Sequence, residues 1–240
     1  MTAALQIDHV SHNFGAVQAL DDVSLTVPRG GFTALLGVNG AGKTTLFSLV
    51  TRLYNNRSGM IRVAGHDLRR EPSQALARLG VVFQSRAMDA DLTIRQNLIY
   101  HASLHGIPGR LARPRIDQVL GQVDLADKAN TRVTALSGGQ SRRAEIARAL
   151  IHSPDLLLLD EATVGLDVKS RAEVLALTRR LIARDGVSAL WATHIMDEID
   201  PADDLVILHR GRVLRQGCAA DIAGPHGLTR AFLDLTGVAP

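Results

Sequence analysis

Aromatic residues make up only 3% of this 240-residue sequence. Proteins that grip single-stranded nucleic acid stack successive bases on aromatic side chains, so this scarcity argues against that class of protein. Cysteine is scarcer still, because Cys218 is the only one in the sequence. A lone cysteine cannot form an internal disulfide, which indicates a reducing compartment.

Long apolar runs are missing as well. No stretch approaches the roughly 20 apolar residues that a helix needs to span a bilayer. The first ten residues lack the basic region and the apolar run of a signal peptide. The net charge of +3 is spread along the chain and requires neither a nucleic acid nor a membrane surface as partner. We therefore expect a chain that is soluble by itself and that leaves any membrane-spanning role to another polypeptide.

The apolar residues that are present form short runs typical of buried strands. These runs occupy residues 32–36, 79–83, 156–159, 189–192 and 205–208. Runs of this length and composition favour strands of a sheet that is covered on both faces. Alternating apolar residues predict further strands around Leu5 and Ile7 and over 23–27.

Helical patterns occupy the segments between these runs. Helices are predicted over 42–52 and 168–183, and residues 88–151 read as mostly helical. Thr93, with Gln96 three residues later, is a capping-box signal for a helix start. The pattern predicts an α/β core interrupted by a helical subdomain.

Two histidines of the helical region suggest a metal ligand pair. His101 and His105 lie four residues apart, a spacing that places both on one face of a helix. No third ligand is evident nearby in the sequence, so we expect a solvated helix face instead.

Residues 37–44 fit the pattern G-x-x-x-x-G-K-[ST] and lie between a predicted strand and a predicted helix. Glycines let backbone N–H groups curl around phosphate oxygens, and the helix start adds the positive end of its dipole. Lys43 supplies a cation to the outer phosphates, and the Thr44 hydroxyl can ligate Mg²⁺. The segment predicts binding of a nucleoside triphosphate by Gly37, Val38, Asn39, Gly40, Ala41, Gly42, Lys43 and Thr44.

An acidic pair, Asp160 and Glu161, ends the apolar run 156–159. Ligands of open α/β sheets bind at the carboxyl ends of the strands. We expect Asp160 to hold Mg²⁺ through water and Glu161 to orient and polarise the attacking water, as general base or electrostatic anchor. The alternative, that the pair merely begins a solvated loop, is disfavoured by the phosphate loop upstream.

Residues 136–140 read Leu-Ser-Gly-Gly-Gln and lie between the phosphate loop and the acidic pair. With these three motifs in this order, the chain resembles the ATP-binding-cassette family over essentially its whole length. The resemblance implies ATP hydrolysis, with ATP and Mg²⁺ as cofactors. It also implies a fold with an α/β P-loop NTPase core, an N-terminal antiparallel β-subdomain and an inserted α-helical subdomain.

The same resemblance implies how a single domain of 1–240 is divided. Residues 1–88 and 152–216 would form the core with its β-subdomain, 89–151 the helical subdomain with the signature, and 217–240 a C-terminal tail.

Cassettes of this family work as head-to-tail dimers, and each ATP lies between one subunit's phosphate loop and the other's LSGGQ segment. The resemblance therefore assigns ATP contacts in trans to Ser137, Gly138, Gly139, Gln140 and, in the loop at the dimer seam, Asp167. The helix start at Ser137 can present N–H donors to a γ-phosphate that arrives from outside. Ser137 can also serve as a helix N-cap, and Asp167 could be only an N-cap.

Further site residues are implied by the resemblance alone. Phe14 occupies the position of an aromatic residue that stacks on adenine. Gln84 occupies the position of a glutamine that reaches Mg²⁺ and the attacking water. His194 occupies the position of a histidine that contacts the γ-phosphate. Their simpler alternatives are an apolar packing residue, a strand-terminal polar residue and an unremarkable histidine. The complete expected sets are catalytic Glu161, His194, Lys43 and Gln84; metal-binding Thr44, Gln84 and Asp160; and Thr45 as an additional ATP-binding residue.

The resemblance also implies partners. It predicts a second cassette, as a homodimer, and a separate transmembrane permease that would hold the chain at the inner face of the cell membrane; no nucleic acid is expected. Residues 88–98 resemble the corresponding stretch of exporter-type cassettes for drugs, lipids or polysaccharides. The alternatives are an importer cassette and a soluble cassette that acts on nucleic acid or ribosomes.

Overall fold

A six-stranded sheet forms the centre of the protein, for which a computed structural model describes residues 3–237. Its strand order is β10-β9-β3-β8-β7-β6, and neighbouring strands are parallel except for β10, which pairs antiparallel with β9. The strands are β3 (Phe32–Leu36), β6 (Leu79–Val82), β7 (Leu156–Asp160), β8 (Ser188–Thr193), β9 (Asp204–His209) and β10 (Arg212–Cys218). Every residue of β3, β7 and β8 is buried, which explains their nearly continuous apolar sequences.

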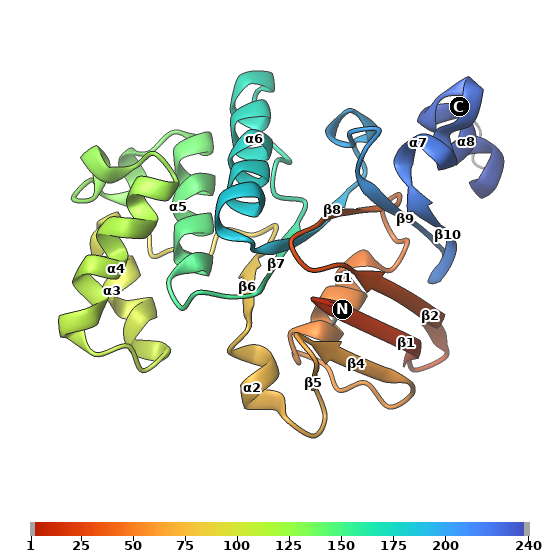
Figure 1. Ribbon diagram of the computed structural model, residues 1–240, viewed down its shortest axis with the longest axis horizontal. Helices are drawn as coiled ribbons and strands as arrows, with labels where there is room; N and C mark the ends of the chain where they lie inside the picture. Colours follow the sequence, from red (N-terminus) through yellow and green to blue (C-terminus); the bar gives the residue numbers. More distant parts are fainter. Residues whose placement is uncertain (1–2, 238–240) are drawn as a thin grey trace.

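A second, antiparallel sheet has the order β2-β1-β4-β5. Its strands are β1 (Leu5–Phe14), β2 (Val17–Val27), β4 (Met60–Val63) and β5 (His66–Asp67). Alternate residues such as Leu5 and Ile7 turn inward and join one hydrophobic cluster with α1 (Lys43–Val50) and one face of the central sheet. Helix α1 thus lies between the two sheets, as Figure 1 shows.

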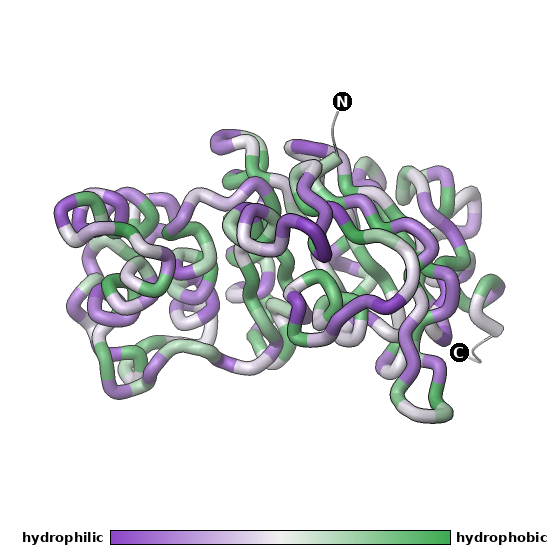
Figure 2. The backbone as a smooth tube through the Cα atoms, turned by 90° about the horizontal axis from the view of Figure 1, so that it is seen from below, coloured by the Kyte–Doolittle hydropathy of each residue, from purple (hydrophilic) through white to green (hydrophobic). Residues whose placement is uncertain are grey.

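Apart from α2 (Pro72–Leu76), which packs beside β4 and β5, the remaining helices cover the other face of the central sheet and extend to one side of it. Helices α3 (Ile94–Leu104), α4 (Gly109–Gln122) and α5 (Gly138–Leu150) gather at the left of Figure 1, and α6 (Val168–Asp185) lies beside α5. Short helices are α2, α7 (Ala219–Ala223) and α8 (Leu228–Thr236), with 3-10 turns at Ala126–Lys128, Val133–Ala135, Met196–Glu198 and Gly224–His226. Along the lateral helices, Figure 2 shows apolar and polar segments alternating, as expected for helices with one buried face.

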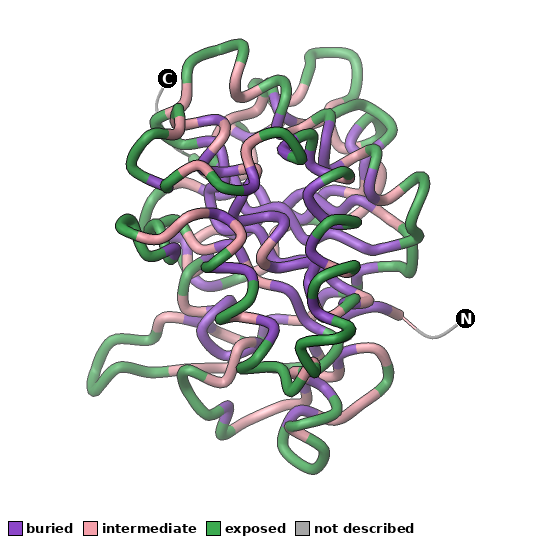
Figure 3. Tube along the Cα trace, turned by 90° about the vertical axis from the view of Figure 1, so that its left-hand side faces the viewer, coloured by how far each residue is buried: buried purple, intermediate pink, exposed green. Residues whose placement is uncertain are grey.

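Core and surface are clearly separated. Buried chain concentrates where the central sheet meets α1 and α6, and exposed chain forms the outer loops (Figure 3). Trp191 is fully buried on β8, beside Phe32 of β3. Within residues 3–237, no helix combines the length and the apolar character that crossing a bilayer requires.

The expected fold class is confirmed, and most elements lie within a few residues of their predicted positions. The capping box is present: Thr93 Oγ1 accepts a hydrogen bond from Gln96 N, and Gln96 Oε1 accepts one from Thr93 N. The helix expected to begin at Gly42 begins at Lys43, because Gly42 has a φ of 110°.

Candidate functional site

The phosphate loop joins β3 to α1 and depends on two glycines. Gly42 has a φ of 110°, and a Cβ atom there would lie 2.8 Å from Leu20 Cδ2. At Gly37 a Cβ atom would lie 2.6 Å from the Leu208 carbonyl oxygen. Both positions therefore exclude larger residues, and the loop can bring its N–H groups close to an anion.

The β9–β10 hairpin supports this loop from one side. Gly211 N donates to Ala41 O at 2.8 Å, and Gly211 O accepts from Asp21 N at 2.8 Å. The preceding residue, Arg210, lines the cleft next to the loop. The sequence analysis did not single out Arg210, because a hairpin residue distant in sequence from the phosphate loop carries no motif.

Lys43 lies at the base of the cleft and is only 5% exposed. Its Nζ donates to Gly37 O at 2.6 Å and to Val38 O at 3.3 Å, and it is 3.3 Å from Glu161 Oε1. The ammonium is thereby held between the phosphate loop and the acidic pair.

The side chains of the other three expected catalytic residues, Lys43, Gln84 and His194, all contact the carboxylate of the fourth, Glu161. Its Oε1 lies 3.3 Å from both Lys43 Nζ and His194 Nδ1, and its Oε2 accepts a hydrogen bond of 3.2 Å from Gln84 Nε2. The backbone of Glu161 is left-handed, with a φ of 48°, and its N–H donates to Ala192 O at 3.0 Å. This conformation turns the carboxylate away from the axis of β7 toward the cleft.

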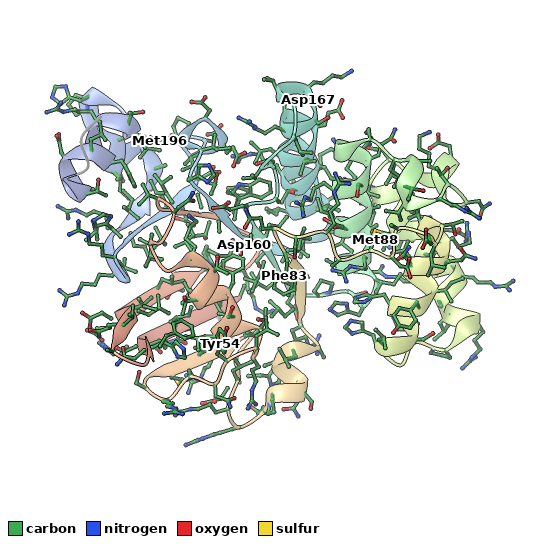
Figure 4. All side chains as sticks on the ribbon, turned by 180° about the vertical axis from the view of Figure 1, so that it is seen from behind. Tyr54, Phe83, Met88, Asp160, Asp167 and Met196 are labelled. Carbon is green, nitrogen blue, oxygen red and sulfur yellow. The ribbon has the colours of Figure 1, made fainter. Side chains whose placement is uncertain are left out.

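Asp160 ends β7 in a buried position, close to Phe83 in Figure 4. Burial raises the pKa of the Asp160 carboxyl, and the charge of Glu161 adds to this, whereas Lys43 and a hydrogen bond from Thr44 oppose it. Among the described residues no group donates to the buried Oδ1 atom. A cation bound beside Asp160 would satisfy that oxygen and favour the charged carboxylate.

Of these groups, Lys43, Gln84 and Glu161 border a cleft of about 620 Å³, a size common for small-molecule sites, whereas Asp160 and His194 are not among the described residues that line it. It is lined by Val17, Gln18, Ala19, Asn39, Gly40, Ala41, Gly42, Lys43, Thr44, Thr45, Gln84, Glu161 and Arg210. The phosphate-loop residues 39–45 and two expected catalytic partners therefore share one cavity. Val17, Gln18 and Ala19 of β2 were not singled out by the sequence analysis.

Phe14 lies near this cleft but is not among the described residues that line it. Its ring packs edge-on against His12 and Tyr54, with centroid separations of 4.7 and 5.3 Å, and the residue is 44% exposed. Phe14 therefore packs against other side chains of the protein, as its simpler alternative expected. The stacking of Phe14 on adenine stays a prediction.

The signature segment does not line the cleft of its own chain. Ser137 is exposed and caps α5, with its Oγ accepting from Gln140 N and Gln140 Oε1 accepting from Ser137 N. Gly139 packs against α6, because a Cβ atom there would lie 2.8 Å from Ser170 Oγ. No signature residue appears among the described residues of the cleft wall. The trans assignment of this segment stays a prediction.

Asp167 caps α6, as its simpler interpretation anticipated. Its two carboxylate oxygens accept from Ser170 N at 2.9 Å and Ser170 Oγ at 2.8 Å, and these bonds lower the pKa of Asp167. Asp167 is exposed at the N-terminal end of α6 (Figure 4), so a second subunit could contact it.

Arg142 and Glu145 on α5 anchor the segment that follows β6, a feature that the sequence analysis missed. Arg142 donates to Phe83 O at 2.7 Å and to Gln84 O at 3.1 Å, and Glu145 Oε1 accepts from Ala87 N at 3.1 Å. The two side chains are buried and 2.6 Å apart. The signature helix and the Gln84 loop are therefore mechanically joined.

Glu198 makes a second buried network that sequence reasoning missed. Its carboxylate is 2% exposed and accepts hydrogen bonds from Trp191 Nε1 at 2.9 Å, from Thr193 Oγ1 at 2.6 Å and from Thr163 Oγ1. Thr163 follows Glu161 and Thr193 precedes His194. Glu198 thus braces the two segments that carry these catalytic residues.

A strand, a glycine-rich loop, a lysine at the start of the next helix and a carboxylate pair on a neighbouring strand define a P-loop nucleoside triphosphatase. The family model described as "ABC transporter" matches residues 20–164 of this chain. The chain therefore belongs to the ABC transporter family, as an ATP-binding subunit that hydrolyses ATP.

Individual relatives agree with this assignment. The daunorubicin resistance ATP-binding protein DrrA3 of Streptomyces coeruleorubidus is 38% identical, covering 98% of this chain and 79% of its own. The Nod factor export ATP-binding protein I of Paraburkholderia xenovorans (strain LB400) is 37% identical, over 90% of this chain and 71% of that protein. Some relatives of similar identity are named as import ATP-binding proteins.

Solved structures extend the likeness to the whole fold. One ATP-binding subunit of an ABC transporter is 27% identical, with a TM-score of 0.83 over 97% of this chain and 99% of its own. Membership of the family implies dimerisation and a membrane permease as partner.

Proposed function

We propose that this chain drives export through a separate permease, as one of two identical cassettes that enclose two MgATP at the cytoplasmic face of the membrane. The observation that carries the proposal is the convergence of Lys43, Gln84 and His194 on the Glu161 carboxylate. A carboxylate held by three polar side chains at the end of a buried strand is suited to orient a water molecule.

Catalysis would then consist of positioning and charge neutralisation. The loop N–H groups and Lys43 bind the outer phosphates, and Glu161 polarises the attacking water for in-line displacement. Gln84 and His194 hold the carboxylate in place through its two oxygens. His194, which is exposed, can also donate to the γ-phosphate.

The residues at the acidic pair suit Mg²⁺. Asp160 Oδ1 is buried without a donor among the described residues, and the Thr44 hydroxyl bonds to the same carboxylate. Together with the Gln84 amide oxygen they form a set of hard oxygen ligands, which Mg²⁺ prefers. When bound, Mg²⁺ would neutralise charge on the outer phosphates.

The signature segment is proposed to complete the site of the second cassette. Ser137 is exposed at the N-terminus of α5, where N–H groups and the helix dipole favour a phosphate. Asp167 lies nearby at the N-terminus of α6, since Gly139 packs on Ser170. ATP would join the two cassettes, and hydrolysis would release them.

The direction of transport is proposed from relatives and from residues 88–98. A drug-resistance protein and a Nod factor exporter match over most of this chain, and residues 88–98 resemble the exporter branch. Import is the second candidate, because import proteins match at similar identity.

Inside-out vesicles that contain the chain and its permease test the proposal. We expect ATP-dependent accumulation of an amphipathic drug inside these vesicles with the wild type. Glu161→Gln should bind ATP normally but reduce phosphate release about 100-fold or more, because the amide cannot polarise water. The exposed Glu173→Gln on α6 is the matched control and should behave as the wild type.

Two results would contradict the proposal. Undiminished phosphate release by Glu161→Gln would remove this carboxylate from the mechanism. ATP-dependent loss of a substrate preloaded into the inside-out vesicles, without accumulation of any drug, would show import.

A further inference from the structure

Three histidines meet beside the central sheet, away from the ATP cleft. His101 and His105 lie at the end of α3, and His152 follows α5. Each ring offers one nitrogen, and these three nitrogens lie within 4.8 Å of one another. The sequence analysis expected no third ligand for the His101–His105 pair; His152 supplies it from a different part of the chain.

The spacing of the first pair already matches a metal site. His105 Nε2 lies 3.2 Å from His101 Nε2. Two nitrogens bound to one tetrahedral Zn²⁺ at about 2.0–2.1 Å are roughly 3.3 Å apart. The His105 and His152 rings are stacked, with centroids 3.9 Å apart and planes inclined by 4°. Because the lone pair of an imidazole nitrogen lies in the plane of its ring, these two stacked rings must turn out of parallel before all three nitrogens can face one ion.

The orientation of His152 is fixed in a way that suits a metal ligand. Its Nε2 lies 3.0 Å from Leu79 O, to which it can only donate. Its Nδ1 is therefore the unprotonated nitrogen, and it is buried without a hydrogen-bond partner among the described residues. Metal-binding histidines commonly donate their second ring nitrogen to a backbone carbonyl, which fixes the tautomer and the ring orientation.

The electrostatic surroundings keep the rings neutral. Burial and the charges of Arg148, His105 and His152 lower the pKa of His101 to about 4, and burial, His105 and Arg115 lower that of His152 to about 4. Arg148 disfavours a nearby cation, and Glu145 compensates part of its charge.

We propose that His101, His105 and His152 bind one Zn²⁺ ion, with the fourth position open to water on the exposed side of His105. Imidazole nitrogens select zinc and the later transition metals, whereas Mg²⁺ prefers oxygen. The site is therefore chemically distinct from the ATP cleft. A bound ion ties α3 to the segment between α5 and β7 and, through Leu79, to β6.

Direct titration with Zn²⁺ against a chromophoric chelator tests the site on the untagged full-length chain. We expect about one Zn²⁺ per chain, and at least about tenfold weaker binding by His105→Ala, which removes a ligand at an exposed position. The matched control is His226→Ala, an exposed histidine remote from the cluster in sequence, which should bind as the wild type. His194→Ala should also bind Zn²⁺ as the wild type does. This result would show that the three-histidine site is separate from the Asp160–Glu161 pair.

Hydrogen exchange locates the ion and guards against misfolding of the variant. Zn²⁺ should slow amide exchange at the end of α3 and around residue 152 in the wild type and in His226→Ala, but not in His105→Ala. Circular dichroism and unchanged ATP affinity would show that His105→Ala is folded. Equal Zn²⁺ affinities of His105→Ala and His226→Ala, or no stoichiometric binding by the wild type, would overturn the proposal.

Discussion

Glu198 does not contact the catalytic carboxylate of Glu161, but it bonds to the two chain segments that carry Glu161 and His194. It binds Thr163 on the chain that leaves Glu161 and Thr193 on the strand that leads to His194. Because the carboxylate is buried, its hydrogen bonds are strengthened by the low local dielectric. Glu198 is therefore a positioning residue for the distance between Glu161 and His194.

Replacement of Glu198 by glutamine should separate positioning from binding. One oxygen becomes an NH₂ group that cannot accept from Trp191 or Thr193, so we expect about 1–3 kcal/mol lower stability. Turnover should fall about tenfold while ATP affinity changes less. Thr193 contacts the phosphate loop through its backbone carbonyl, which accepts from Gly37 N at 3.2 Å, and not through the side chain that bonds to Glu198. Phosphate release and fluorescent-nucleotide titration measure the two effects.

Asp197→Asn, in the same short turn but exposed, is the matched control for this variant. An unchanged turnover in Glu198→Gln, together with lower stability, would assign the network to folding alone.

At the residue scale, the sequence predicted the groups that belong to motifs and missed those that support them. Lys43 and Glu161 follow local patterns of strand, glycine and helix, whereas His194 was implied by the family resemblance alone. Glu198 and His152 act through contacts with distant residues, and a single polar side chain in a turn produces no pattern. Their roles are visible only after folding has brought β8, β6 and α3 next to them.

Helix α5 connects the signature to the Gln84 loop, so its N-terminus is the element to test in trans. Ser137→Arg places a long side chain where a partner's phosphate would lie. We expect nearly unchanged MgATP affinity in the isolated chain, with loss of both hydrolysis and ATP-dependent dimerisation. Fluorescent-nucleotide titration and light scattering measure these quantities side by side.

Thr93→Arg is a matched control, because Thr93 is the capping-box residue of α3 as Ser137 is of α5. Both variants lose an N-cap, which costs about 0.5–2 kcal/mol. Only Ser137→Arg should lose dimerisation. A tenfold loss of ATP affinity in Ser137→Arg would mean that the signature acts in its own chain.

At the element scale, continuous apolar runs made the central strands predictable, and the capping box made the start of α3 predictable. Residues 217–240 were expected to form a tail with no assigned helix. The structure has α7 and α8 there, with Phe232 buried against the core. Leu228, Phe232 and Leu235 of α8 pack against the core at the spacing of an amphipathic helix, so this periodic signal was present in the sequence and was missed.

For the whole molecule, we propose that the lateral helices form the surface that contacts the permease. Ile99, Tyr100, Leu104 and Leu111 of α3 and α4 are all exposed, and Tyr100 is 64% exposed. Exposed apolar side chains on neighbouring helices favour a protein partner. The anchoring of the Gln84 loop by Arg142 would connect this surface to the ATP site.

We expect Tyr100→Asp to reduce membrane recruitment by a co-expressed permease while ATP binding is retained. Leu53→Asp, at a position of equal exposure beyond α1, is the control and should be recruited normally. Fractionation at low and high salt measures recruitment, since adhesion to anionic lipid would fade with ionic strength. Salt-resistant membrane binding by the chain without a permease would contradict the partner requirement.

The left-handed backbone of Glu161 makes selection for activity and selection for stability act in opposite directions. A residue with a side chain in this conformation costs about 1–3 kcal/mol, and glycine would relieve most of that strain. The substitution that relieves the backbone strain is thus one that removes the carboxylate, together with its ion pair to the buried Lys43. A lineage released from the need to hydrolyse ATP would no longer be selected to keep this strained carboxylate and would be expected to lose Glu161 early.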